Sequence, residues 1–456
     1  MSLYDGQNDT IAAVATAWGE GGIAIVRMSG ANALPILKAC FRPAKAGHGF
    51  KPNVLTYGKI VYEGIVLDEC MAVFMEKRAS YTREDVAEIQ CHGGEASIRA
   101  ILDALLHLGA RAALPGEFTK RAFLNGRIDL AEAEAVMSVV GARGEAALRS
   151  GIRQMEGGIS EFVTKISELL SDLLSGIAAA TDFPEEIDEE EAIGDLLRGI
   201  DEVLAELDAH LDERRAKVVR EGASIVLSGR PNVGKSSLMN ALLRRERAIV
   251  TDIAGTTRDV LTERIRLGGI WAELSDTAGL RETHDPIERI GVERAERAAQ
   301  TADVLLYVLD ASECLSHEDI SAIQNASDNM LVCLNKTDAA CVTTAEDVRA
   351  YNDKIAIMCI SARTGDGMDE LTECLRKRVG GEDMREDILT SERHIALARR
   401  AREALVRARE SAAAGIPADM CYGDVEQALE YLGEITGKNV REDVIERVFA
   451  SFCVGK

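Results

Sequence analysis

The sequence has few aromatic residues, no closely spaced cysteine pair and no excess of basic charge. Phe, Trp and Tyr make up 4% of the 456 residues, a composition that suits helices packed through Ala and Leu. The ten cysteines form no C-x-x-C pair and no Cys/His cluster at metal spacing, which favours free thiols over zinc sites or disulfides. The formal charge of -23 excludes binding of nucleic acid through a broad basic surface, so any RNA contact must be local.

Membrane signals are also missing from the sequence. The N-terminus lacks the basic start and apolar core of a signal peptide, and no apolar run reaches the length that spans a bilayer. We therefore expect a cytoplasmic protein without a membrane partner. Its 456 residues exceed what one hydrophobic core usually organises, which favours about three domains.

The hydrophobic pattern divides the chain into four segments. Residues 1–125 mix strands with helices and predict a compact α+β domain, in which a proline opens a helix over 115–125. Residues 126–220 and 383–456 carry apolar side chains at helical spacing. They bracket residues 221–382, which read as an α/β domain. The two ends of such a domain lie close together, so its insertion disturbs a host domain little. We therefore expect one discontinuous helical domain around it.

A phosphate-binding loop follows the predicted strand Ala223–Ser228. The segment Gly229–Ser236 reads G-x-x-x-x-G-K-S and leads into a helix. Glycines let successive N–H groups face phosphates, Lys235 neutralises the β and γ oxygens, and the Ser236 hydroxyl is a ligand for Mg²⁺.

Guanine selection is predicted from Asn335-Lys336-Thr337-Asp338, which follows a second predicted strand. The Asp338 carboxylate accepts hydrogen bonds from the ring N–H and the amine of guanine, whereas adenine leaves this charge unpaired. Ser361, Ala362 and Arg363 follow a third strand and complete the base pocket.

Two further segments match the switch regions of a GTPase. Asp276-Thr277-Ala278-Gly279 ends a strand where a carboxylate reaches Mg²⁺ through water, and Gly279 meets the γ-phosphate. Upstream lies the first switch, in which Thr256 and Thr257 compete as the metal ligand and Thr257 is preferred. Its residues are Thr251, Asp252, Ile253, Ala254, Gly255, Thr256 and Thr257.

The residue that positions the attacking water is left open by these motifs. Leu280 stands where a Ras-like GTPase has glutamine, and it cannot bind water, so the candidates lie among residues 281–289. Asn232 either supplies a carbonyl to a monovalent cation beside the phosphates or only binds neighbouring backbone. Cys453 is either a spare thiol or a reactive one, since Gly455 and Lys456 exclude a prenylation box.

With these residues, the chain resembles the MnmE (TrmE) family of tRNA modification GTPases over essentially its whole length. The family is related to the TrmE-Era-EngA-like GTPases. The resemblance rests on residues 21–30, Pro115–Phe118, Arg121–Asn125, the phosphate loop with Asn232, the first switch, Asp276–Glu282 and Phe452–Lys456. Arg83 stands where the family commonly has glycine, and Val454 where it commonly has isoleucine.

The resemblance implies a multidomain α/β and α architecture. Residues 1–125 would form an α+β domain that binds folate and dimerises, and residues 126–220 with 383–456 a helical domain. Residues 221–382 would form an inserted Ras-like P-loop GTPase domain, and such domains meet across the homodimer when K⁺ and GTP bind.

The resemblance also implies the ligands. Asn232, Thr251, Ile253 and Thr256 would hold K⁺, Ser236 and Thr257 Mg²⁺, and Glu288 would help to orient water. Lys235 and Cys453 complete the expected catalytic set. Arg27, Glu84, Arg127 and Lys456 would face 5-formyl- or methylene-tetrahydrofolate. The full GTP-binding set adds Val233, Gly234, Ser237, Asp252, Ala254, Gly255, Asp276, Thr277, Ala278, Gly279, Asn335, Lys336, Asp338, Ser361, Ala362 and Arg363.

The implied activity is potassium-stimulated GTP hydrolysis coupled to tRNA modification. With the flavoprotein MnmG, in a heterotetramer, the family adds an aminomethyl or carboxymethylaminomethyl group at carbon-5 of the wobble uridine. The alternative is a regulatory GTPase switch in ribosome assembly. Such GTPases usually carry a basic RNA-binding appendage, which this acidic chain does not show.

Overall fold

The computed structural model describes residues 9–45, 50–183, 185, 188–246, 262–276, 300–380 and 388–456. The chain forms two compact units. The first comprises Met1–Met137, Gln154–Gly199 and Glu403–Lys456, and the second comprises Ser138–Arg153 and Ile200–Arg402.

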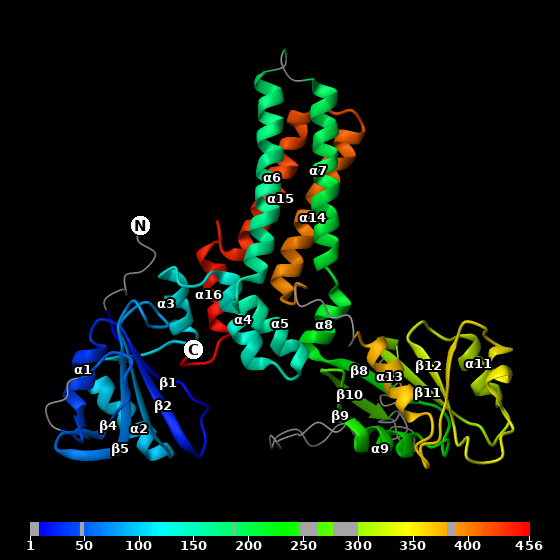
Figure 1. The fold of residues 1–456 in the computed structure, drawn as a ribbon, viewed down its shortest axis with the longest axis horizontal. Coiled ribbons are helices and arrows are strands. Elements are labelled where there is room, and N and C mark those ends of the chain that lie inside the picture. The colour runs from blue at the N-terminus through cyan, green and yellow to red at the C-terminus, as the bar shows by residue number, and fades with distance from the viewer. Residues whose placement is uncertain are drawn as a thin grey trace, which may run out of the picture. The chain divides into compact units, whose positions relative to one another are not determined.

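The first unit begins with a seven-stranded mixed sheet (Figure 1). Its strand order is β3-β4-β5-β6-β2-β1-β7, in which only β1 and β7 pair in parallel. Helices α1 and α2 pack together on it and bury a continuous apolar core. The elements are β1 Ile11–Val14, β2 Gly21–Ser29, α1 Ala33–Cys40, β3 Phe41–Pro43, β4 Thr56–Tyr62, β5 Ile65–Met75, β6 Val86–Gly93, α2 Glu95–His107, β7 Arg111–Ala112 and α3 Glu117–Leu124.

Helix α3 begins at Glu117, so the prediction that Pro115 opens it is wrong. Gly116 stands between them in the left-handed region, at φ +66°. A Cβ at Gly116 would lie 2.5 Å from the carbonyl oxygen of Phe449. The approach of the C-terminal segment therefore fixes where this helix starts, which the local sequence does not reveal.

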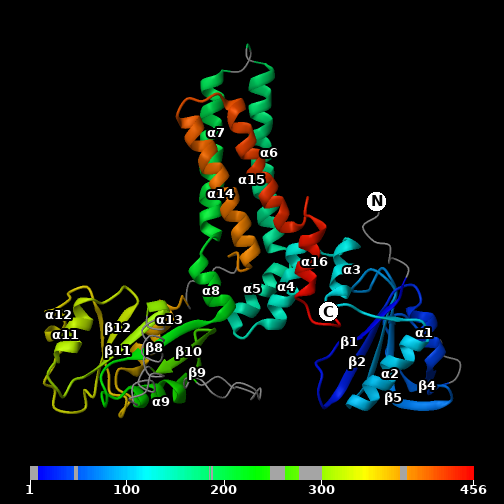
Figure 2. The same ribbon diagram turned by 180° about the vertical axis from the view of Figure 1, so that it is seen from behind.

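Helices from both sides of the central segment pack in the first unit. Helices α6 and α15 lie side by side (Figures 1 and 2). Arg407 of α14 binds Asp424 and Gln427 of α15. The elements outside the two sheet regions are α4 Leu130–Gly141, α5 Glu145–Met155, α6 Gly158–Asp182, α7 Glu189–His210, α8 Glu213–Glu221, α14 Glu392–Ala413, α15 Ala418–Thr436 and α16 Glu442–Ala450. No helix of the described ranges combines the length and apolarity that crossing a membrane requires.

The second unit contains a six-stranded sheet of order β13-β12-β11-β8-β10-β9. All neighbours pair in parallel except β9, which joins β10 antiparallel at the edge. Helices α9 and α13 cover one face, and α11 and α12 cover the other. The elements are β8 Ala223–Ser228, α9 Lys235–Glu246, β9 Thr262–Leu267, β10 Ile270–Asp276, β11 Val304–Asp310, α11 His317–Gln324, β12 Met330–Asn335, α12 Ala345–Arg349, β13 Ala356–Cys359 and α13 Met368–Arg378.

The strand registers of this sheet bring the predicted motifs to one edge. Asp276 at the end of β10 pairs with Leu227 of β8, and Asn335 at the end of β12 pairs with Asp310 of β11. The loops after parallel strands meet at the carboxyl edge of such a sheet, where α/β folds bind ligands.

Candidate functional site

The loop between β8 and α9 is held in a conformation that only glycine allows at its two ends. Gly229 and Gly234 have φ of +133° and +98°. A Cβ at Gly229 would overlap the Val308 carbonyl oxygen, and one at Gly234 would overlap the Asn335 side chain. Lys235 is buried, and its Nζ donates to the carbonyls of Gly229 at 2.8 Å and Arg230 at 2.7 Å. The phosphate-loop cation thus lies directly over the loop.

Side chains of the Asn335–Asp338 motif fasten this loop to the rest of the site. Asn335 Nδ2 donates to the Val233 carbonyl at 2.9 Å, while its Oδ1 accepts from the Ala362 N–H at 3.0 Å. Lys336, itself at φ +65°, donates to the Asn232 carbonyl at 2.8 Å. Three segments far apart in the sequence are therefore joined by two buried or half-buried side chains.

Asp338 is held with its carboxylate ionised. Its Oδ1 accepts from the Ser361 hydroxyl at 2.6 Å, and Oδ2 lies 2.5 Å from Arg363 Nη2. The Ser361 hydrogen bond first, and then the Arg363 charge, hold the pKa of Asp338 below its ordinary value. A cavity of about 680 Å³ opens beside it, lined among others by Gly234, Ser237 and Asn335. An anionic acceptor at this position can bind the two adjacent donors of guanine.

The expected metal ligands are only partly described. Ser236 lies in the first turn of α9 and is exposed, and Asp276 ends the neighbouring strand β10. A hydroxyl and a carboxylate form an oxygen donor set, which fits Mg²⁺. The other candidates from the switches lie outside the described residues: Thr251, Asp252, Ile253, Ala254, Gly255, Thr256, Thr257, Thr277, Ala278, Gly279 and Glu288.

Asn232 has a well-defined backbone position. It adopts φ +65° in the loop, and its carbonyl oxygen accepts from Lys336 Nζ. Its side chain is exposed on the surface of the loop. The carbonyl bond accounts for the backbone of Asn232 and leaves both roles considered for its side chain open.

Three of the four candidate folate residues gather in the first unit around two aromatic rings. The Arg27 guanidinium lies 5.7 Å from the centre of the Phe118 ring, and that of Arg127 lies 4.8 Å from the Tyr81 ring. Burial raises the pKa of Tyr81, while the charges of Arg127 and Arg27 oppose that shift. The Phe118 N–H donates to the Lys456 carbonyl at 3.2 Å. Two guanidiniums and the C-terminal segment therefore lie beside Tyr81 and Phe118, which pack in one apolar cluster.

The C-terminal segment is fixed by backbone contacts to the N-terminal sheet region. The Gly116 N–H donates to the Cys453 carbonyl at 3.4 Å. Gly455 has φ +94°, and a Cβ there would overlap the Val14 carbonyl oxygen. Cys453 itself is exposed. Its thiol is thus accessible, on a segment whose position depends on close backbone packing.

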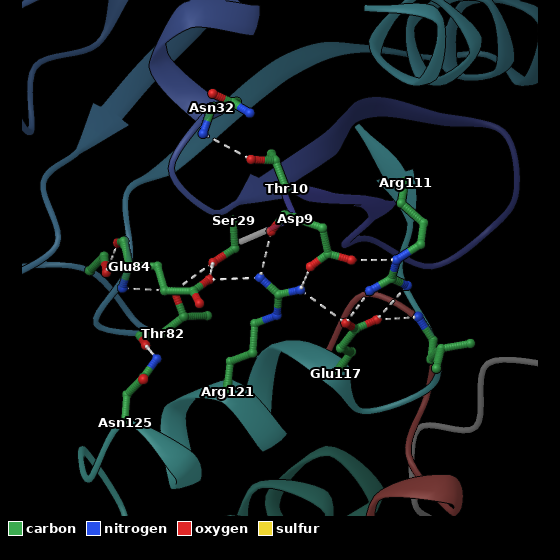
Figure 3. A network of polar contacts seen from close by, with 12 residues as sticks. Asp9, Thr10, Ser29, Asn32, Thr82, Glu84, Arg111, Glu117, Arg121 and Asn125 are labelled. Carbon is green, nitrogen blue, oxygen red and sulfur yellow. Dashed lines mark hydrogen bonds and ion pairs between the residues drawn. The ribbon is translucent and has the colours of Figure 1, made fainter. Parts of the chain in front are cut away.

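Glu84 belongs to a buried polar network that includes Arg121 of α3, the helix that also carries Phe118 (Figure 3). Its Oε2 accepts from Ser29 Oγ at 2.8 Å and from Arg121 Nη1 at 3.0 Å. Arg121 also binds Asp9 and Glu117. Sequence reasoning gave no role to Arg121, although it lies in the quoted motif of residues 121–125, because a single arginine carries no signal of burial.

Two family models match this chain. Residues 130–453 match the MnmE helical domain, and residues 10–127 match the GTP-binding protein TrmE N-terminus. The chain belongs to the MnmE family. Two tRNA modification GTPases named MnmE are similar over nearly their full length. That of Alkaliphilus oremlandii is 41% identical over 458 residues, and that of Heliobacterium modesticaldum is 43% identical over 470 residues. Each alignment covers 98% of this chain and 99% of the relative.

As a member of the MnmE family, the chain is a GTP-hydrolysing enzyme of tRNA modification. The family match favours this activity over the ribosome-assembly alternative. Among solved structures, Aquifex aeolicus Era is 28% identical, with a TM-score of 0.29 over 40% of this chain and 66% of that one. A score this low supports no inference about the fold.

Proposed function

We propose that this protein is a potassium-stimulated GTPase that modifies carbon-5 of the wobble uridine in certain tRNAs. With a flavoprotein of the MnmG type, it adds an aminomethyl or carboxymethylaminomethyl group, drawing the carbon from 5-formyl- or methylene-tetrahydrofolate. The match to MnmE relatives over 98% of the chain carries the proposal. A cytoplasmic homodimer that forms a heterotetramer with MnmG is part of it.

The nucleotide site supplies the groups that hydrolysis needs. Lys235 neutralises the phosphate oxygens, and Asp338 binds guanine. We assign Ser236 and Thr257 to Mg²⁺, with Asp276 reaching the metal through water. The potassium ligands would be Asn232, Thr251, Ile253 and Thr256, and Glu288 would orient the attacking water. When bound, K⁺ supplies positive charge where charge develops in the transition state.

The N-terminal site would bind a flat, anionic folate. The half-buried Tyr81 ring offers apolar surface, and the guanidiniums of Arg127 and Arg27 offer charge beside it. Arg27 and Lys456 suit a glutamyl carboxylate. Cys453 is exposed on the same C-terminal segment as Lys456, which supports a chemical role for its thiol in the modification.

Nucleoside analysis of tRNA tests the purpose of the enzyme. Cells that lack this protein should lose the carbon-5 substituent of wobble uridine, and the wild-type chain should restore it. Cys453→Ser should restore GTP hydrolysis but not the modification, whereas Cys341→Ser, at another exposed thiol, should restore both. Unchanged nucleosides in the deletion strain would contradict the proposed function.

The salt dependence of hydrolysis tests the cation. Replacing KCl by NaCl should slow GTP hydrolysis by about tenfold or more, because a fixed positive charge at the phosphates strongly stabilises the transition state. Asn232→Ala should remove most of the difference between the two salts. Equal rates of the wild-type enzyme in both salts would exclude the potassium site.

A further inference from the structure

Arg121 is the centre of a buried charge network in the N-terminal region. Its side chain is 3% exposed, and three carboxylates surround its guanidinium (Figure 3). Nη1 lies 3.0 Å from Glu84, while Nη2 lies 2.7 Å from Asp9 and 3.1 Å from Glu117. The second arginine of the network, Arg111, binds Asp9 and Glu117.

The carboxylates of this network offset the burial of the Arg121 guanidinium. Burial acts to lower the pKa of Arg121, but the charge of Glu84 and the hydrogen bonds to the three carboxylates raise it. Its Nε–H is buried and has no acceptor among the described residues. An unpaired buried donor is unfavourable, and buried ion networks contribute little net stability. We therefore interpret the network as a device that holds side chains in place rather than as a source of net stability.

The backbone before Glu84 is held by bonds that do not involve Arg121. Asn125 Nδ2 donates to the Thr82 carbonyl at 2.7 Å, and the Ser29 and Thr82 hydroxyls lie 2.7 Å apart. Ser80 Oγ donates to the Glu84 carbonyl. Arg121 adds something different, because the only group of this turn to which it donates a hydrogen bond is the Glu84 carboxylate. Its removal should therefore leave the turn in place and release the side chain of Glu84.

We propose that Arg121 is the positioning residue for the Glu84 carboxylate in the folate site. The inference rests on the proposed function together with the family resemblance, which implies that Glu84 faces the folate. Arg121 and Ser29 fix the same oxygen, Oε2, and the Glu84 side chain remains 18% exposed. Helix α3 also carries Phe118, which lies under Arg27 and binds the Lys456 carbonyl. Helix α3 thus contacts the Glu84 carboxylate, the Arg27 guanidinium and the backbone of Lys456.

Folate binding by the full-length protein tests this role. Calorimetry would measure the dissociation constant of 5-formyltetrahydrofolate for the wild type, Arg121→Gln, Glu84→Gln and the double variant. Each single change should weaken binding by about tenfold or more, since both remove a hydrogen bond to a charged group. The double variant should bind as weakly as the weaker single variant, because Arg121 acts through Glu84.

Arg111→Gln is the matched control. Arg111 binds the same Asp9 and Glu117 but not Glu84, so its change should alter the folate dissociation constant by less than about twofold. GTP hydrolysis by Arg111→Gln should stay at the wild-type rate. The far-ultraviolet circular dichroism spectrum and the thermal unfolding transition of every variant, compared with those of the wild type, verify that the N-terminal region is folded. If Arg121→Gln does not fold, Arg121→Lys replaces it in the same cycle, because lysine keeps the buried charge.

The outcomes distinguish the positioning role of Arg121 from the proposed folate site. Additive losses in the double variant, or an equal loss in Arg111→Gln, would overturn the role of Arg121 and leave the proposed function intact. A wild-type protein that binds no folate would instead refute the folate site itself, and the positioning role with it.

Discussion

The proposed guanine pocket, which lies beside Asp338, and the proposed folate site in the N-terminal region are built in opposite ways. In the pocket, each motif directly follows a strand of one mostly parallel sheet, so that Gly234, Asn335 and Ala362 meet at its carboxyl edge. The N-terminal site draws on β2, a turn, α3 and the last residues of the chain. Those last residues are held there by close backbone contacts at Gly116 and Gly455. Ligand binding at the first site should therefore be most sensitive to substitutions that remove a polar side chain. Binding at the second should be most sensitive to substitutions that add a side chain where two backbone segments touch.

Asp338→Asn should have the largest effect, and it tests the side-chain half of this comparison. The amide cannot accept from both donors of guanine, so GTP should bind about a hundredfold more weakly or worse. Xanthosine triphosphate, which presents a carbonyl where guanine has its amine, should bind the variant better than GTP does. Measurement is by calorimetry with both nucleotides.

Ser361→Ala serves as the control for that change. It removes the 2.6 Å hydrogen bond to Asp338 but keeps the carboxylate, so GTP affinity should fall by only about fivefold. If the two variants lost equal affinity, guanine recognition would reside in the shape of the loop and the contrast between the two sites would weaken.

Gly455→Val tests the backbone half of the comparison. Gly455 has φ +94°, and a Cβ there would overlap the Val14 carbonyl oxygen, so the C-terminal residues should leave their position. We expect folate affinity to fall by about tenfold, with GTP hydrolysis unchanged. Carboxypeptidase should then digest the end of the variant faster than that of the wild type.

Val454→Ala is the matched control, because Val454 is 52% exposed. It should leave folate affinity and digestion unchanged. Normal folate binding by Gly455→Val would show that the C-terminal segment is not part of the site.

The smallest expected effect concerns Arg83 in the turn before Glu84. Arg83 adopts φ +55° and donates to the carbonyls of Asn125 and Gly126. Arg83→Ala loses these bonds and keeps the left-handed backbone, whereas Arg83→Gly loses the bonds but relieves the strain. The free energy of unfolding of Arg83→Gly should therefore exceed that of Arg83→Ala by about 1 kcal/mol, as measured by urea unfolding. Equal stability of the two variants would show that the turn carries no strain.

The pattern of apolar residues located some elements of the chain closely and missed others. Strand Ala223–Ser228 is confirmed at both ends, because a short apolar run is followed at once by glycine. The short strand Ile11–Val14 was not predicted, since its four residues become a strand only by pairing with β2 and β7. The residue boundaries of the predicted domains stay predictions.

By itself, the sequence indicated the α+β N-terminal domain, the helical domain and the P-loop GTPase domain of this MnmE-family GTPase, and it predicted Asp338 as the guanine-selecting residue. Those features depend on residues adjacent in the chain and on the rule that loops after parallel strands meet at the carboxyl edge of the sheet. Only the tertiary structure decided that Arg121 holds Glu84, that Asn335 joins two loops, and that Gly116 sets the start of α3. Each of these depends on a contact between distant residues, whose burial and distance no local pattern specifies.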